Sequence, residues 1–227
     1  MLPPSRFFPP VADADEEGFL AWSGDLSVAA LVDAYTHGIF PWPCDRAHIL
    51  WFALPVRSVL FLDRLQLPRS LRRELKKAPW TFSVNADFDA VIRQCAAVKR
   101  RGEQGTWITP KMIRAYRELH RAGGAWSFEA WDAAGRLVGG LYGVLLGRFF
   151  AGESMFHLVD GASKFALVNA LDFLRRERQV EWVDTQVPSP LFERLGACCI
   201  GRDEYLQRLE RALGDLKNDG EEDILPA

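Results

Sequence analysis

A carboxylate and a lysine stand where the sequence pattern predicts a buried junction between a strand and a helix. Residues 147–167, GRFFAGESMFHLVDGASKFAL, open with an aromatic run typical of a strand, in which Glu153 lies among small residues, and Lys164 opens a predicted helix. Two interpretations are open. The first is a surface turn in which Glu153 and Lys164 form an ion pair. The second is a backbone that walls a pocket, to which the charged groups belong.

A second polar pair, Asp184 and Gln186, falls two residues apart in a predicted strand, VEWVDTQV. Alternate residues of a strand project from the same face, so the pair is either the polar side of a half-buried strand or a catalytic pair. A carboxylate supplies negative charge, whereas an amide is a very poor base and acts through hydrogen bonds. The sequence has no GxSxG elbow and no Cys/His spacing that identifies a thiol nucleophile. No covalent nucleophile is therefore apparent in the sequence.

A short basic segment after Pro68, PRSLRRELKKAPW, predicts a helix with three cations on one face. Arg69, Arg73 and Lys76 are spaced i, i+4 and i+7, so they project from the same side. They form either a solvated face or a site for the phosphates of a nucleic acid.

The composition limits the function classes. The 227 residues carry a net charge of −2, so an RNA partner must be met by a local patch. There is no apolar run near the ~20 residues of a membrane helix, and the N-terminus does not resemble a signal peptide. The four cysteines lack CxxC spacing, which predicts reduced thiols and a cytoplasmic protein, and four scattered histidines argue against a zinc site. Eight tryptophans and fifteen phenylalanines either fill the core or line a groove for flat ligands.

The order of predicted elements indicates an α+β fold. A helix capped by Asp25 or Ser27 precedes one or two strands in HILWFALPVRSVLFL, and amphipathic helices follow the basic segment at 85–100 and 109–122. Three strand-like runs between 125 and 156, a helix from about Ser163, and strand, short helix, strand and helix complete the chain. We expect a small N-terminal α/β domain at 1–64, a basic helical segment at 65–102, and a domain at 103–227 whose mixed, largely antiparallel sheet is flanked by helices, in the order of an acyltransferase of the GNAT type.

Taken together, these segments resemble the bacterial leucyl/phenylalanyl-tRNA–protein transferases. The matching stretches run in order from about residue 18 to 210: GDLSVAALVDAYTHGIFPW, ILWF, TWITPKMIRAYRELHRAG, LVGGLYGVLLGRFFAGESMF, ASKFAL, DTQ and LGACCIGRDEYL. The resemblance implies a GNAT-like C-terminal domain and transfer of leucine or phenylalanine from charged tRNA to proteins that begin with Arg or Lys. Such transfer marks those proteins for degradation by the N-degron pathway. The resemblance implies no metal or cofactor, and we expect a monomer.

The resemblance also assigns roles to residues. It makes Asp184 and Gln186 the catalytic pair, in which Gln186 positions the attacking amine as a hydrogen-bond acceptor and Asp184 supplies negative charge. The absence of a nucleophile motif is consistent with direct transfer. The basic helix becomes the tRNA contact. The aminoacyl-adenosine end of the donor is expected to meet five residues: Tyr35, Trp42, Trp107, Tyr116 and Glu153. Four further residues are expected to shape the pocket for the donor side chain: Leu141, Phe150, Met155 and Leu167. Without the resemblance, the aromatic and aliphatic residues among them would be interpreted as core.

The chain departs from the family pattern at residues 53–56, 126, 157 and 191. These departures leave open a diverged or inactive relative that binds aminoacyl-tRNA and has a different acceptor. An acyl-CoA N-acetyltransferase would share the fold, but it should carry a Gln/Arg-x-x-Gly-x-Gly/Ala loop for the pyrophosphate. Only Gly152 and Gly161 lie near the expected place, without that spacing.

Overall fold

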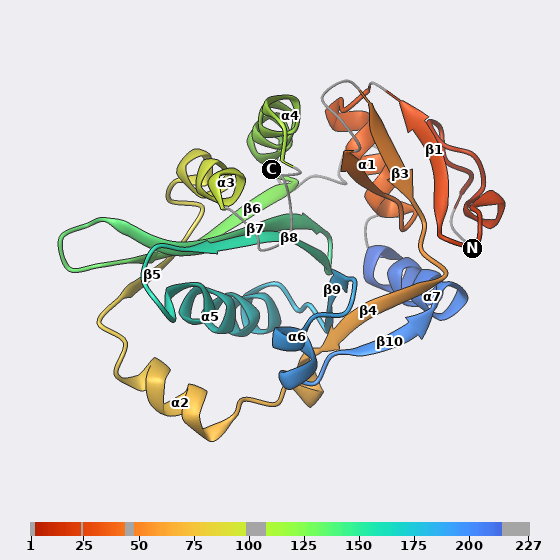
Figure 1. The fold of residues 1–227 in the computed structure, drawn as a ribbon. Coiled ribbons are helices and arrows are strands. Elements are labelled where there is room, and N and C mark those ends of the chain that lie inside the picture. The colour runs from red at the N-terminus through yellow and green to blue at the C-terminus, as the bar shows by residue number, and fades with distance from the viewer. Residues whose placement is uncertain (1–2, 24, 44–47, 99–107, 215–227) are drawn as a thin grey trace.

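A computed structural model describes residues 3–23, 25–43, 48–98 and 108–214. The N-terminal part forms a three-stranded antiparallel sheet in the order β1-β3-β2, with one helix packed beside it (Figure 1). Its elements are β1 (Phe19–Ser23), α1 (Val28–Thr36), β2 (Phe40–Pro43) and β3 (Ile49–Phe52). Of these strands, only β3 falls in a run that the sequence predicts to be extended, because β1 and β2 are short and lack clear alternation.

The rest of the chain builds a seven-stranded sheet in the order β10-β4-β9-β8-β7-β6-β5. Neighbouring strands are antiparallel except β8 and β9, which run parallel. The strands are β4 (Val56–Phe61), β5 (Thr81–Val84), β6 (Ala125–Trp131), β7 (Leu137–Leu146), β8 (Phe149–His157), β9 (Trp182–Gln186) and β10 (Cys198–Gly201). The predicted α+β fold with a mixed, largely antiparallel sheet is therefore confirmed.

Helices cover both faces of this sheet. Above it in Figure 1 lie α3 (Phe88–Ala97) and α4 (Pro110–Arg121), and below it lies α5 (Ala162–Glu177). Two apolar clusters fill these layers, one shared with the small sheet and one between the large sheet and α5. The short α6 (Pro190–Arg194) follows β9, and α7 (Arg202–Leu213) ends the described chain against β4 and β10.

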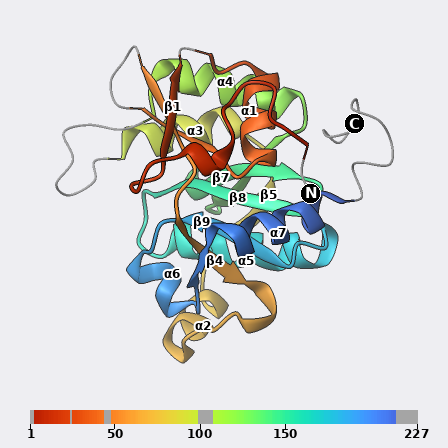
Figure 2. The same cartoon turned by 90° about the vertical axis from the view of Figure 1, so that its right-hand side faces the viewer.

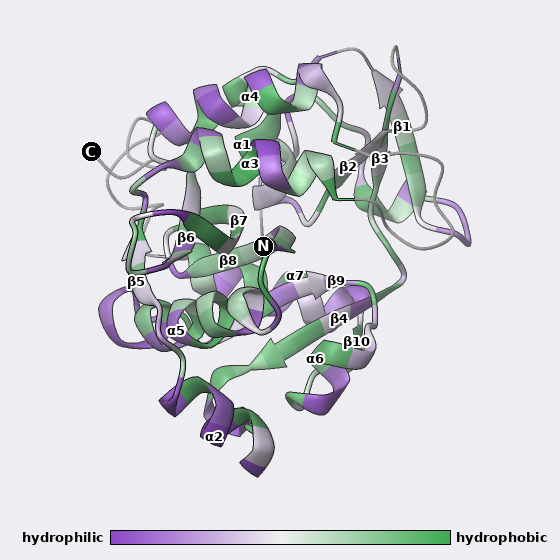
Figure 3. Ribbon diagram, turned by 60° about the vertical axis from the view of Figure 1, so that its left-hand side comes forward, coloured by the Kyte–Doolittle hydropathy of each residue, from purple (hydrophilic) through white to green (hydrophobic). Residues whose placement is uncertain are grey.

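The basic segment forms α2 (Arg69–Lys76), at the end of the molecule opposite the small sheet (Figure 2). Figure 3 shows α2 as mainly hydrophilic, whereas β4 is hydrophobic. β4 belongs to the large sheet, so the chain passes from one sheet to the other between β3 and β4. The domain boundaries at 64 and 102 stay predictions. Within the described ranges, no helix combines the length and apolar character needed to cross a membrane.

Helix starts follow from capping side chains. The hydroxyl of Ser27 accepts from Ala30 N, the Asp87 carboxylate from Ala90 N, and the Thr109 hydroxyl from Met112 N. Of the two predicted caps of the first helix, Ser27 and not Asp25 is thus the cap, and Asp87 caps α3. The helix predicted near Ser163 starts at Ala162, after Gly161 with a φ of 85°.

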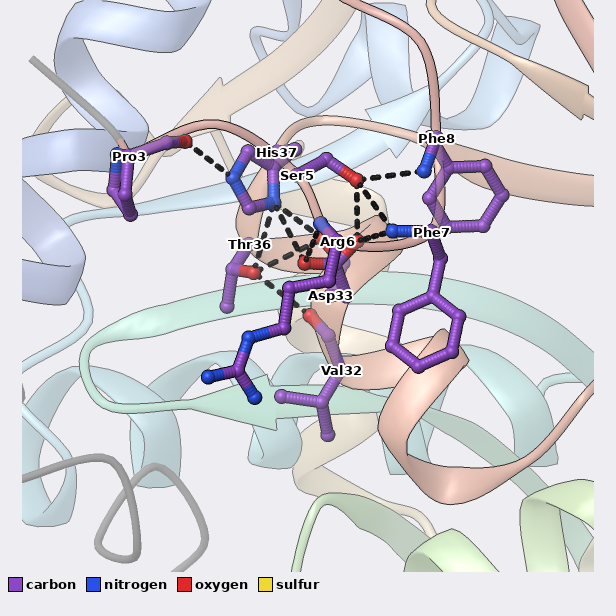
Figure 4. A network of polar contacts seen from close by, with 9 residues as sticks. All are labelled: Pro3, Ser5, Arg6, Phe7, Phe8, Val32, Asp33, Thr36 and His37. Atoms are coloured by element: carbon purple, nitrogen blue, oxygen red, sulfur yellow. Dashed lines mark hydrogen bonds and ion pairs between the residues drawn. The ribbon is translucent and has the colours of Figure 1, made fainter.

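The leader before β1 is attached to α1 by polar contacts (Figure 4). The Asp33 carboxylate accepts from the Ser5 hydroxyl and from the backbone N–H of Arg6 at 3.2 Å. The His37 ring donates from Nε2 to the Pro3 carbonyl at 2.8 Å. The leader, which the sequence predicts to be irregular, is therefore fixed to the small sheet's helix.

Candidate active site

The candidate site lies where the two parallel strands separate. β8 and β9 pair only at Phe150 with Val183 and at Ala151 with Asp184. Beyond these pairs, β8 carries one extra residue, Glu153, relative to its other partner strand β7. In the same way β9 carries one extra residue, Thr185, relative to its other partner strand β4. Such bulges bend a strand and redirect its side chains. A gap therefore forms at the carboxyl end of β9.

A cavity of about 310 Å³ occupies this place. One part of its wall is apolar and comes from β7, β8, α5 and α6, while β2 supplies Phe40, Pro41 and Trp42. Glu153 and Gln186 supply polar groups. The complete lining is Phe40, Pro41, Trp42, Leu141, Tyr142, Gly152, Glu153, Ser154, Met155, Leu167, Thr185, Gln186, Val187, Ser189 and Phe192.

Glu153 is a buried carboxylate with two hydrogen bonds, one of which continues to a third residue. Its Oε1 accepts from Gln186 Nε2 at 2.9 Å, and its Oε2 accepts from the Tyr116 hydroxyl at 3.2 Å. Because that bond uses the only proton of Tyr116, Tyr35 donates to Tyr116 across 2.6 Å. Lys164 lies exposed on α5, whereas Glu153 is buried. These two described residues therefore do not form the ion pair of the first interpretation.

Burial sets the protonation of this group. It raises the pKa of the Glu153 carboxyl to about 7, although the neighbouring hydroxyls of Tyr35 and Tyr116 lower that pKa. Burial also raises the pKa of Tyr35 and of Tyr116 well above the ordinary value, so both remain neutral hydroxyl donors. The charge of Glu153 therefore changes near neutral pH.

Gln186 has an unusual backbone. Its φ of 61° lies in the left-handed region, where a side chain other than glycine is disfavoured. The carboxylate of Asp184 accepts from Gln186 N at 2.8 Å, and Val187 N bonds to the Thr185 carbonyl at 2.8 Å. These bonds hold the tight turn that ends β9. The turn brings the amide side chain into the cavity and against Glu153.

Asp184 lies behind Gln186, is 1% exposed and is not part of the cavity wall. Both of its oxygens face Arg57 Nε at 3.2 Å, and its Oδ2 accepts from the Tyr205 hydroxyl at 2.8 Å. Burial lowers the pKa of the Arg57 guanidinium, but the facing Asp184 carboxylate more than offsets this and holds that pKa above its ordinary value. The pair is an ion pair sealed from solvent.

Arg57 and Tyr205 have no assigned role in the sequence analysis. Arg57 interrupts the apolar run HILWFALPVRSVLFL, and a charge in a buried strand requires a partner. The sequence therefore carries a signal for Arg57, although no role follows from it. Nothing in the sequence near Tyr205 points to a strand that lies 21 residues earlier.

The structure brings together most of the predicted pocket. Leu141, Met155 and Leu167 line the cavity, and Trp42 lies at its wall with 42% of its surface exposed. Phe150 does not reach it: the side chain is 1% exposed and packs edge-on against Phe128 at 5.8 Å. Phe192 of α6, which pattern reasoning missed, lines the cavity instead.

Three other predicted residues have different positions. Tyr35 and Tyr116 are buried behind Glu153 and do not line the cavity. Trp107 lies outside the described residues. Within those residues, no group of three or more His, Cys, Asp or Glu side chains is arranged to hold a metal ion.

The basic residues of α2 lie apart from the cavity. Arg69, Arg73 and Lys76 are exposed. Together with Arg72 and Lys77 they line a shallow hollow on the surface of α2. The cationic face predicted from the sequence is thus present on the surface.

Comparison with known proteins gives consistent matches along the chain. A family model described as "Leucyl/phenylalanyl-tRNA protein transferase" matches residues 59–210, and the model of the N-terminal domain of that family matches residues 24–54. A leucyl/phenylalanyl-tRNA–protein transferase of Pseudoalteromonas atlantica is 47% identical, over 93% of this chain and 90% of its own. That of Lawsonia intracellularis is 44% identical, over 91% and 90% of the two chains.

Two solved structures show a distant similarity. L-PGS from Bacillus licheniformis has a TM-score of 0.48 at 12% identity and covers 78% of this chain and 66% of its own. A GCN5-related N-acetyltransferase from Sphaerobacter thermophilus has a TM-score of 0.38 at 15% identity, with 82% and 58% covered.

Proposed function

The chain belongs to the leucyl/phenylalanyl-tRNA–protein transferase family, and we propose that it seats an aminoacyl ester and a free amine together in the cavity between β8 and β9. It is an aminoacyltransferase that takes leucine or phenylalanine from aminoacyl-tRNA and transfers it to protein. The acceptor in this proposal is the N-terminal amine of a protein beginning with Arg or Lys, which is thereby marked for degradation by the N-degron pathway. The enzyme works as a monomer in the cytoplasm, where its charged tRNA is found.

The reaction is aminolysis of an ester. The acceptor nitrogen forms a bond to the ester carbonyl carbon, the bond from that carbon to the ribose oxygen breaks, and an amide results. The amine loses a proton and the departing ribose hydroxyl gains one. Because the donor is already activated, holding the two substrates together supplies much of the rate.

Gln186 orients the amine in this mechanism. Its Nε2 is committed to Glu153 at 2.9 Å, so its Oε1 is the end that is left to accept a hydrogen bond from the substrate. This is the observation that carries the proposal. Asp184 holds the turn below through Gln186 N and adds negative charge that favours the amine as it becomes positive.

The donor fits the opposite part of the cavity. Leu141, Met155 and Leu167 supply an apolar wall for the leucine or phenylalanine side chain, and an unbranched methionine can repack between the two. Trp42 offers an exposed ring on which the terminal adenine stacks, a contact worth about 1–3 kcal/mol. Trp107 has the same role in this proposal. Tyr35 and Tyr116 act through Glu153, which they hold.

The α2 face binds the tRNA body in this proposal. Arg69, Arg73 and Lys76 contact phosphates of the acceptor stem, so a chain of net charge −2 meets its RNA through a local patch.

The direct test is transfer of labelled leucine or phenylalanine from charged tRNA to peptides that differ only in the first residue. We expect product with Arg and Lys at that position and none with an acetylated N-terminus. Tight binding of charged tRNA without transfer would identify an inactive relative, and transfer to other first residues would identify a different acceptor. Turnover of acetyl-CoA by the same protein would contradict the proposal.

A further inference from the structure

Arg57 lies where the small sheet meets the large one. It is the second residue of β4, is 3% exposed, and donates a hydrogen bond from Nε to Asp184. Its Nη2 donates to the carbonyl of Gly38 at 2.9 Å and to the Tyr205 hydroxyl at 3.3 Å. One guanidinium thus contacts strand β9, helix α7 and the turn that leads into β2.

Two aromatic rings enclose the same group. The guanidinium carbon lies 4.6 Å from the ring centre of Phe40 and 4.6 Å from that of Tyr205. Such contacts are favourable and strengthen when water is excluded. Phe40 lines the cavity and precedes Trp42 by two residues on β2. Arg57 therefore touches the wall that carries Trp42 as well as the carboxylate behind Gln186.

Tyr205 completes the arrangement from α7. Its hydroxyl donates to Asp184 Oδ2 at 2.8 Å, and its ring packs on Arg57. Burial raises the pKa of Tyr205 well above the ordinary value, so it remains a donor at every working pH.

We propose that Arg57 and Tyr205 are positioning residues for the transfer reaction. They hold Asp184 in the orientation from which it fixes Gln186, and Arg57 in addition fixes β2 against β9, so that the donor seat at Trp42 keeps its distance from the amine-binding amide. The inference rests on the proposed part of Asp184 in transfer. It assigns to two residues outside the cavity wall a control over both substrates.

An arginine suits this place because its planar fork offers several donors in fixed directions. Nε bonds to Asp184 while Nη2 bonds to Gly38. A lysine keeps the charge, but its single ammonium cannot reproduce both directions and the stacking together. The substitution Arg57→Lys therefore separates charge from geometry.

Arg202 provides a matched control. It is half-buried and binds backbone carbonyls across the same junction, with Nη1 2.8 Å from Val11 O and Nε 3.4 Å from Leu54 O. It does not touch Asp184 in the described contacts. Arg202→Lys thus weakens the junction without disturbing the carboxylate.

The experiment compares Arg57→Lys, Tyr205→Phe and Arg202→Lys by kcat and by KM for charged tRNA, with thermal unfolding as the check on folding. We expect Arg57→Lys to lower kcat at least about tenfold and to raise the KM for the donor, because both of its connections change. Tyr205→Phe keeps the ring and loses only the hydroxyl, so kcat should fall about 10- to 100-fold with an unchanged donor KM. Arg202→Lys should leave both constants within about twofold of the parent.

A double-mutant cycle decides whether Tyr205 acts through Asp184. In an Asp184→Asn background, Tyr205→Phe should have no further effect on kcat. An equal fold-change in both backgrounds, or an Arg202→Lys variant as impaired as Arg57→Lys, overturns the inference. If Asp184→Asn itself transfers at the parental rate, the proposed function of Asp184 fails first. If Arg57→Lys does not fold, the cycle at Tyr205 gives the answer alone.

Discussion

The side chain of Gln186 is oriented by that of Glu153, with Nε2 2.9 Å from Oε1. Each residue stands at an irregularity of its strand, Glu153 in the bulge of β8 and Gln186 in a left-handed turn. The two strands no longer pair at this point, so the hydrogen bond between these side chains spans the gap that the backbone leaves. In the proposed mechanism, the orientation of Gln186 therefore depends on the protonation state of one buried carboxyl group.

The first prediction concerns the pH dependence of transfer. The pKa of Glu153 is raised to about 7, so the carboxylate that accepts from Gln186 is lost as the pH falls through that value. The attacking α-amine, with an ordinary pKa of about 7.7–8.0, must also be deprotonated. Below pH ~6.5 the logarithm of kcat/KM should rise with a slope of about 2 per pH unit in the parent protein. Glu153→Gln should show a lower rate and a slope of about 1, and an unchanged slope of 2 in this variant would remove Glu153 from the profile.

The second prediction concerns stability. The folded pKa of Glu153, about 7, lies above the ordinary value of 4.5, so the unfolded chain releases this proton first as the pH rises. The stability that the protonated group contributes is complete below pH ~4.5 and is lost as the pH rises through about 7. The loss is on the order of 3 kcal/mol.

Glu153→Gln cannot lose a proton, and its carbonyl can still accept from Tyr116. We expect the free energy of unfolding of this variant to exceed that of the parent at pH 8, and the difference to shrink toward pH 5. Urea denaturation at both values measures it. Equal pH dependence in the two proteins would show that Glu153 titrates normally.

The sequence predicts the regular parts of this fold because local chemistry determines them. Ser27, Asp87 and Thr109 begin helices through a single side-chain acceptor, which is visible within four residues of sequence. Glu153 and Gln186 were predicted as site residues, the first because a carboxylate among strand-forming residues needs a reason.

The remaining features depend on pairing between distant strands. A bulge is one residue out of register with a partner, so neither strand shows it alone. The contact of Arg57 with Tyr205 joins residues 148 positions apart. Phe150 has the same strand-like pattern as its neighbours, and only the packing of Phe128 against it shows that it faces the core.

The third prediction uses the backbone of Gln186. A non-glycine residue at a φ of 61° costs on the order of 1 kcal/mol or more, which glycine avoids. Gln186→Gly should therefore be at least as stable as Gln186→Ala, with a difference of about 1 kcal/mol measured by denaturation. Both should lose most of the transfer activity, since both lack the amide. A glycine variant less stable than the alanine variant would show that the turn is not strained.

The fourth prediction concerns donor choice and Phe192. This side chain lines the cavity from α6, whereas its neighbour Leu191 does not. Phe192→Ala should remove part of the apolar wall and enlarge the cavity. The ratio of kcat/KM for phenylalanyl- and leucyl-tRNA should then change by about 10-fold or more, since a few methylenes are worth about 1–3 kcal/mol each.

Leu191→Ala is the control, because it removes a half-buried side chain of the same helix. It should lower stability without altering the donor ratio. If both variants change the ratio equally, α6 as a whole, and not the wall at Phe192, controls donor choice.

The last prediction tests the α2 face through salt. Each phosphate contact adds about 0.7–0.9 to the slope of log affinity against log salt concentration, because a bound counterion is released. Arg73→Gln should reduce the slope for charged tRNA by about one such step, and the combined change of Arg69, Arg73 and Lys76 to Gln by about two to three. Arg121→Gln, at the exposed end of α4, is the control and should leave the slope unchanged. Because all these variants remove surface charge, only a loss confined to α2 assigns the phosphates to that helix, and an equal loss at Arg121 would show a general effect of charge instead.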